Sequence, residues 1–160
     1  MNYIFQKKNH NSYQCGAYSI YNLLVHMKCN MKCNMKLNIK LNDIIHSCKA
    51  TKENGTLVNN FNETLEKFNI HLNTEQNVTI QTIKDINKPI IILFHWFEYA
   101  NEGTHYALID EFYKDDYGAY KFRVINYSFD KPIHIITERE LKSMLLPYEI
   151  DNCKMPTIWY

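Results

Sequence analysis

Apolar residues in the first half of the chain recur at the spacing that places them on one face of an α-helix. From Gln14 this spacing predicts a first helix, whose apolar face is Ala17, Ile20, Tyr21, Leu24 and Met27. A shorter series predicts a second helix, whose apolar face is Leu41, Ile44, Ile45 and Cys48. A third helix is expected after the Gly55-Thr56 turn, with Thr56 as its N-cap and a buried face of Leu57, Phe61, Leu65 and Phe68.

The second half of the chain is rich in β-branched and aromatic residues, which favour strands. Pro89 opens the apolar run PIIILFHWF, and proline suits the first position of a strand. The segments HYALIDEFY and YKFRVINYS flank the turn-rich KDDYGA and predict a hairpin, and PIHII predicts a further short strand. Thr137 and Glu140 form a capping box that predicts a last helix, which carries Leu141, Leu145 and Leu146.

These elements predict an α+β fold in a single domain over residues 1–160. Its helical lobe is expected at about 1–75 and its antiparallel β lobe at about 76–160. Between the first two helices, residues 27–42 read MKCNMKCNMKLNIKLN, a tandem repeat of a four-residue unit. A period of four drifts against the helical period of 3.6, so its apolar face would spiral around a helix. Cys29 and Cys33 lack the partners of a four-ligand site, so no metal is expected and the repeat is interpreted as a connector without chemistry.

Composition and charge exclude several classes of protein. The net charge of +1 provides no basic field, which argues against nucleic acid as the main partner. No apolar run reaches the length of a membrane span, and the N-terminus lacks the pattern of a signal peptide. The five cysteines are an odd number without the spacing of a disulfide framework. A reduced protein of the cytoplasm, without a cofactor, is therefore expected.

Cys15 is a candidate nucleophile because it lies beside Gly16 where the first helix begins. Cysteine is more often an inert core residue. The N-terminus of a helix, however, carries a positive partial charge and unpaired N–H groups, which stabilise a thiolate. Gly16 would leave room for a substrate to approach the backbone. The position thus favours nucleophilic chemistry at Cys15.

A cysteine nucleophile needs a base, usually a histidine that is held by an amide or a carboxylate. Among the seven histidines, His105 stands out because it opens a strand directly after the loop NEGT. A hairpin turn centred on Asp115-Asp116 places His105 opposite Asn126, and opposed side chains share one face of a sheet. The Asn126 side chain could then hold the imidazole by a hydrogen bond. A bulge at Gly118 would move Asn126 to the other face.

The order of these segments resembles that of the papain-like cysteine peptidases, and most narrowly the compact double-glycine (bacteriocin-leader) peptidases. The resemblance rests on the motifs QCGAYS, NGT, GTHYALI and VINYS and spans about residues 3–146. It implies a papain-like fold in which Cys15 is the nucleophile and His105 the general base and acid. It also implies that Asn126 orients His105.

The same resemblance implies an upstream amide that donates to the oxyanion hole. Gln6 is the preferred residue, Asn9 has the usual spacing to the cysteine, and Gln14 is a third candidate. The implied activity is hydrolysis of a peptide or isopeptide bond in a peptide or protein bound between the two lobes. Two alternatives stay open. One is an acyltransferase, deamidase or transglutaminase-like enzyme with the same triad, and the other is a peptide-binding module without catalysis.

Overall fold

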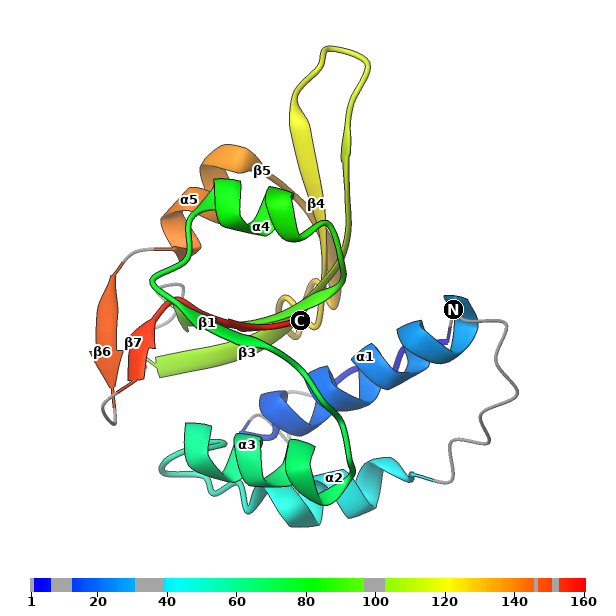
Figure 1. Cartoon of the computed structure of the whole chain (residues 1–160), viewed down its shortest axis with the longest axis vertical. Coiled ribbons are helices and arrows are strands. Elements are labelled where there is room, and N and C mark those ends of the chain that lie inside the picture. Colours follow the sequence, from blue (N-terminus) through cyan, green and yellow to red (C-terminus); the bar gives the residue numbers. More distant parts are fainter. Residues whose placement is uncertain (1, 7–12, 31–38, 97–102, 146, 151–152) are drawn as a thin grey trace.

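The structure is a computed structural model that describes residues 2–6, 13–30, 39–96, 103–145, 147–150 and 153–160. These segments contain five helices and eight strands (Figure 1). In chain order they are α1 (Cys15–Asn30), α2 (Leu41–Cys48), α3 (Val58–Lys67), β1 (Thr74–Gln76), α4 (Ile80–Ile86), β2 (Ile90–Trp96), β3 (Gly103–Lys114), β4 (Tyr120–Ile125), β5 (Ile133–Thr137), α5 (Glu138–Met144), β6 (Tyr148–Ile150), β7 (Cys153–Met155) and β8 (Thr157–Trp159).

A six-stranded antiparallel sheet separates two layers of helices. Its strand order is β1-β8-β2-β3-β4-β5, and β6 and β7 form a separate pair. Alternate residues of a strand point to opposite faces, so Ile91 and Leu93 of β2 pack with α1, α2 and α3. Ile90 and Ile92 point the other way and pack with α4 and α5. Figure 1 shows the two groups of helices on either side of the strands, which confirms the α+β class.

The first two predicted helices are confirmed, as α1 and α2. The third begins one residue later than expected, because Leu57 and not Thr56 is the N-cap of α3. Thr56 is buried against Gly16, so its side chain packs inside the protein instead of capping the helix. Leu57 consequently lies outside the helix, and its side chain is exposed rather than part of the buried face.

The predicted hairpin exists as β3 and β4, but its register differs from the expected one. Tyr113 pairs with Lys121, because the turn covers residues 115–119 and is longer than a turn centred on Asp115-Asp116. The Asp115 side chain accepts the N–H groups of Tyr117 and Ala119, and Gly118 has a φ of +78°. The register shifts again between Ile109 and Glu111. His105 therefore does not lie opposite Asn126 in the ladder, and the register expected for a turn at Asp115-Asp116 is wrong.

The capping box of Thr137 and Glu140 is confirmed at the start of α5. The short helix α4 and the strands β1, β6, β7 and β8 were not predicted. The tandem repeat begins inside α1 and ends inside α2, while its residues 31–38 lie outside the described residues. No helix in the described segments is both long and apolar enough to cross a membrane.

Candidate active site

Cys15 is the first residue of α1 and lies in the core between that helix and the sheet. Only 5% of its surface is exposed. Burial raises the pKa of the Cys15 thiol to about 11, and the backbone N–H groups of Tyr106, Gly16 and Cys15 itself offset only part of this rise. The interaction with Tyr106 places the sulfur against β3, one residue from His105. The structure thus holds a neutral thiol and not the thiolate expected at a helix N-terminus, since desolvation outweighs the N–H groups.

His105 lies on β3, next to the residue that the Cys15 sulfur contacts. Its ring atom Nε2 is 2.7 Å from the main-chain oxygen of Asn126. A carbonyl oxygen can only accept, so Nε2 carries the hydrogen and Nδ1 carries the lone pair of the neutral ring. Burial lowers the pKa of His105 to about 4, and the Asn126 carbonyl opposes this shift. At neutral pH the imidazole is therefore an uncharged base.

Asn126 holds two residues of the site at once. It follows β4 with a φ of +62°, in the left-handed region that asparagine tolerates better than most residues. Its main-chain oxygen faces His105, whereas its side-chain Nδ2 donates to Gln6 Oε1 over 2.9 Å. The sequence predicted that the side-chain amide orients the imidazole, and the structure assigns that contact to the main chain. The left-handed backbone turns the carbonyl toward His105 and leaves the side chain for Gln6.

Gln6 is brought to the site by the N-terminal segment and is buried, with 6% of its surface exposed. Because Gln6 Oε1 accepts from Asn126, its amide nitrogen is the end that can donate to an oxyanion. Of the two other candidates, Asn9 lies outside the described residues. Gln14 precedes α1, and its main-chain oxygen accepts the N–H of Tyr18 over 3.2 Å. The geometry favours Gln6, since it alone of the two described candidates is hydrogen-bonded to Asn126.

Gly16 has a packing role that differs from the one expected. A Cβ atom at Gly16 would lie 2.9–3.0 Å from three side-chain atoms of Thr56. The missing side chain therefore admits Thr56, and not a substrate, to the first turn of α1. Thr56 Oγ1 and Gln14 Oε1 are buried without hydrogen-bond partners in the described structure. A buried polar atom without a hydrogen-bond partner costs free energy of folding. The start of α1 therefore carries unsatisfied polar atoms close to Cys15.

Three of the four predicted residues are joined by hydrogen bonds although they lie far apart in the sequence. Gln6 bonds Asn126, Asn126 bonds His105, and the Cys15 sulfur contacts the residue after His105. At neutral pH the Cys15 thiol is neutral and the His105 imidazole is uncharged.

Sequence reasoning missed a second group of side chains, which surrounds Asp110 on the same face of the sheet. Asp110 accepts hydrogen bonds from Tyr3 and Arg123. The available signal was an acidic residue inside the apolar strand segment HYALIDEFY, in a chain with only two arginines. Comparisons with protein-family models and with curated proteins find no match for this chain.

Proposed function

We propose that this protein is a papain-like cysteine peptidase, in which Cys15 is the nucleophile and His105 the general base. The observation that carries the proposal is the continuous set of contacts from Gln6 through Asn126 to His105, with the Cys15 sulfur at the adjacent residue of β3. A cysteine nucleophile is activated by an adjacent base, and the start of α1, with Cys15, packs on β3, the strand that carries His105.

The neutral forms of Cys15 and His105 define the first step. His105 Nδ1 takes the proton of the Cys15 thiol, and the sulfur attacks the carbonyl carbon of the substrate. The Asn126 carbonyl accepts the Nε2 hydrogen and stabilises the imidazolium that forms. The amide nitrogen of Gln6 and the N–H groups at the start of α1 stabilise the oxyanion.

The second half of the reaction returns the protein to its resting state. The imidazolium gives its proton to the leaving amine as the carbon–nitrogen bond breaks, which leaves a thioester on Cys15. His105 then takes a proton from water, and the hydroxide attacks the thioester. The acid product departs, and the proton returns to the sulfur. The core fills the space between the helices α1 to α3 and the sheet, so the substrate, a peptide or isopeptide, has to reach Cys15 at the start of α1.

A second candidate function is peptide binding without catalysis, on a peptidase scaffold. It is favoured by the burial of Cys15, because a thiol with 5% exposed surface and a pKa raised to about 11 is a poor nucleophile at rest.

Cys15, Cys29 and Cys48 are free thiols, consistent with the reducing cytoplasm that we propose as the location.

The test is cleavage of a peptide library by the reduced protein, followed by mass spectrometry of the products. Cleavage is expected in the wild type and in Cys48→Ala, a matched control because Cys48 is also a buried free thiol whose pKa is raised to about 11. Cys15→Ala should abolish it. Products that form only after an amine acceptor is added would indicate acyl transfer. Binding of peptides without any cleavage would refute the peptidase and support the binding module.

A further inference from the structure

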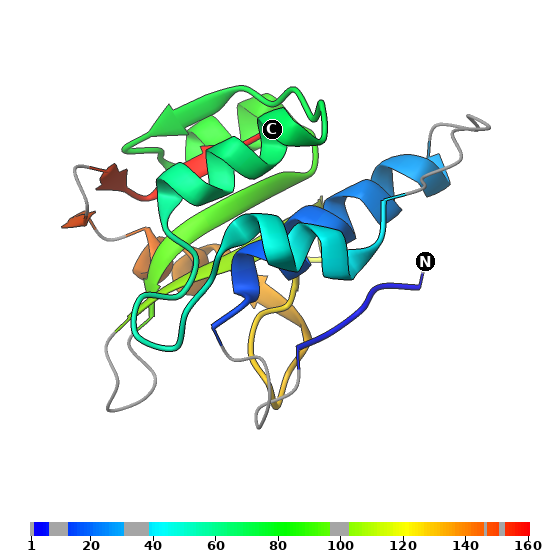
Figure 2. The same cartoon turned by 90° about the horizontal axis from the view of Figure 1, so that it is seen from below.

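The N-terminal segment 2–6 runs beside α1 and ends at the candidate active site (Figure 2). Two hydrogen bonds tie its backbone to that helix. The N–H of Ile4 donates to Asn22 Oδ1 over 3.0 Å, and Asn22 Nδ2 donates to the Ile4 oxygen over 2.9 Å. Asn22 is fully buried, so its amide has no water to replace these bonds. A single side chain thus satisfies both backbone groups of one residue in the segment.

A second anchor holds the segment one residue earlier. The Tyr3 hydroxyl donates to Asp110 Oδ2 over 2.5 Å and lies 3.0 Å from His26 Nδ1. Since the one hydroxyl hydrogen goes to Asp110, His26 Nδ1 donates to the Tyr3 oxygen. Burial and the Asp110 carboxylate raise the pKa of Tyr3, so the hydroxyl keeps its hydrogen at neutral pH.

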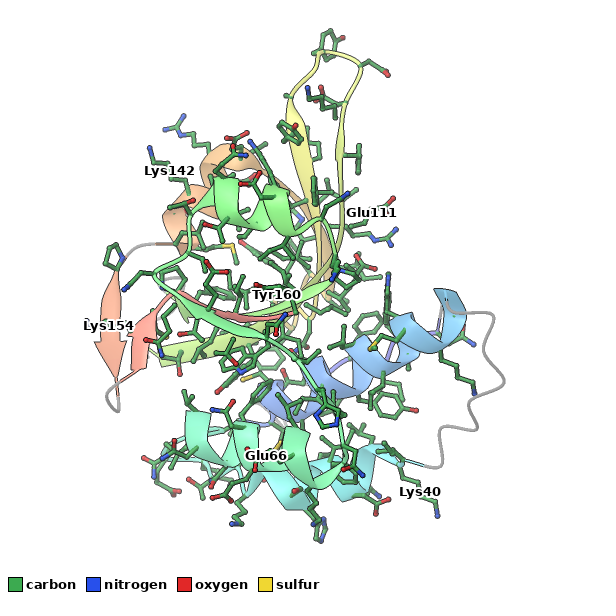
Figure 3. All side chains as sticks on the ribbon, viewed as in Figure 1. Lys40, Glu66, Glu111, Lys142, Lys154 and Tyr160 are labelled. Carbon is green, nitrogen blue, oxygen red and sulfur yellow. The ribbon has the colours of Figure 1, made fainter. Side chains whose placement is uncertain are left out.

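Asp110 is a rigid partner for Tyr3. Arg123 holds it through two hydrogen bonds of 2.8 Å, from Nε to Oδ1 and from an outer nitrogen to Oδ2. The same arginine also pairs with Glu111 at 2.8 Å, and Figure 3 shows Glu111 on the side of the molecule where α1 ends. The Asp110 side chain has no exposed surface. Although burial opposes ionisation, the nearby His26 ring, at 3.8 Å, and the hydrogen bonds from Arg123 and Tyr3 outweigh it and lower the pKa of Asp110 to about 2.

The bulge in β3 explains how two successive acids reach one arginine. The register shifts between Ile109 and Glu111, where two residues of β3 oppose one residue of β4. Without the bulge, Asp110 and Glu111 would point to opposite faces. Asp110 already lies on the α1 face, because it follows Tyr106 and Leu108 in the alternation of β3. The shift brings Glu111 to the same face, so that both carboxylates reach Arg123.

Only two residues separate Tyr3 from Gln6, and an extended residue spans about 3.3–3.6 Å. The two anchors therefore limit where the Gln6 amide can lie. We propose that Tyr3, Asn22 and Asp110 are positioning residues that hold segment 2–6 as a strap, which places Gln6 against Asn126 for its role in the oxyanion hole. This inference rests on the proposed peptidase function, and it adds residues that act through Gln6 and do not touch the substrate.

The kinetic test uses Tyr3→Phe, which removes the hydroxyl and keeps the ring. Loss of an oxyanion donor costs about 100-fold or more in kcat, so partial displacement of Gln6 should lower kcat about tenfold with KM unchanged. In a Gln6→Ala background the same substitution should have no further effect, because the residue on which the strap acts is gone. Tyr117→Phe, at a side chain that is 96% exposed, is the matched control and should have wild-type kinetics. An equal loss in both backgrounds, or none in either, would overturn the proposal.

A structural test gives an answer even if no peptide is cleaved. Hydrogen exchange of the Ile4 amide should be slow in the wild type and at least tenfold faster in Tyr3→Phe and in Asn22→Ala. Asn22→Asp keeps the acceptor for the Ile4 N–H and should show an intermediate rate, which guards against a variant that merely fails to fold. Unchanged exchange in all three variants would refute the strap. If exchange of the Ile4 amide is faster in the variants but the wild type cleaves no peptide, the peptidase is refuted and the strap remains supported.

Discussion

Lowering the pH should destabilise this protein through His105. Burial lowers the pKa of this imidazole from its ordinary value of 6.5 to about 4, and the Asn126 carbonyl opposes the shift only in part. In the unfolded chain the ring titrates near 6.5, so on acidification the unfolded state takes up the proton first. The stability that His105 contributes is therefore complete above about pH 6.5 and is lost as the pH falls toward 4.

The size of this loss follows from the difference between the two pKa values. Each pH unit corresponds to about 1.4 kcal/mol, so the interval from 6.5 to about 4 corresponds to about 3 kcal/mol. Domains of this size are stable by about 5–15 kcal/mol, so the loss is large enough to measure. The window is distinct from that of Asp110, whose lowered pKa of about 2 removes stability only below its ordinary value of 3.8.

The assay is urea unfolding at several pH values between 7 and 4, followed by the fluorescence of the tryptophans, of which Trp159 is fully buried. His105→Gln is the matched variant, because glutamine can still donate to the Asn126 carbonyl but cannot titrate. We expect the free energy of unfolding to fall by about 3 kcal/mol more in the wild type than in the variant. Curves that fall in parallel would show that His105 is not held neutral by burial, and would refute the reasoning.

Three further substitutions or reactions test the site. Gly16→Ala should lower the free energy of unfolding by about 1–3 kcal/mol, because its Cβ would meet Thr56 at 2.9–3.0 Å. Thermal unfolding measures this loss and shows whether adding Thr56→Ala removes it. Asn126→Gly should be more stable than Asn126→Ala by about 1 kcal/mol in denaturant unfolding, because only glycine relaxes the φ of +62°; equal stabilities would contradict a left-handed residue there. Iodoacetamide at about pH 6 should alkylate the exposed Cys29 before the buried Cys15, as mass spectrometry of a digest would show. Faster labelling of Cys15 would mean that the resting thiol is already ionised.

The sequence was sufficient for much of the secondary structure and for the identity of the candidate residues. Apolar spacing predicted α1 and α2, because the buried face of a helix recurs with its turn. Capping chemistry predicted the start of α5, since Thr137 and Glu140 act only on the turn they begin. Cys15 and His105 could be chosen because a helix start and a strand start are local features. Signals of this kind depend on neighbours in the chain and can be read without the fold.

Tertiary structure decided the contacts among those residues. The register of β3 and β4 depends on a turn shaped by Gly118 and on the shift beside Asp110, and neither is visible in the alternation of apolar residues. The main chain of Asn126, and not its amide, faces His105 because of a left-handed backbone that the residue type allows but does not require. A helix start predicts a thiolate at Cys15, yet the layers that bury it raise its pKa. Desolvation and register are properties of packed elements, so they exist only once distant segments meet.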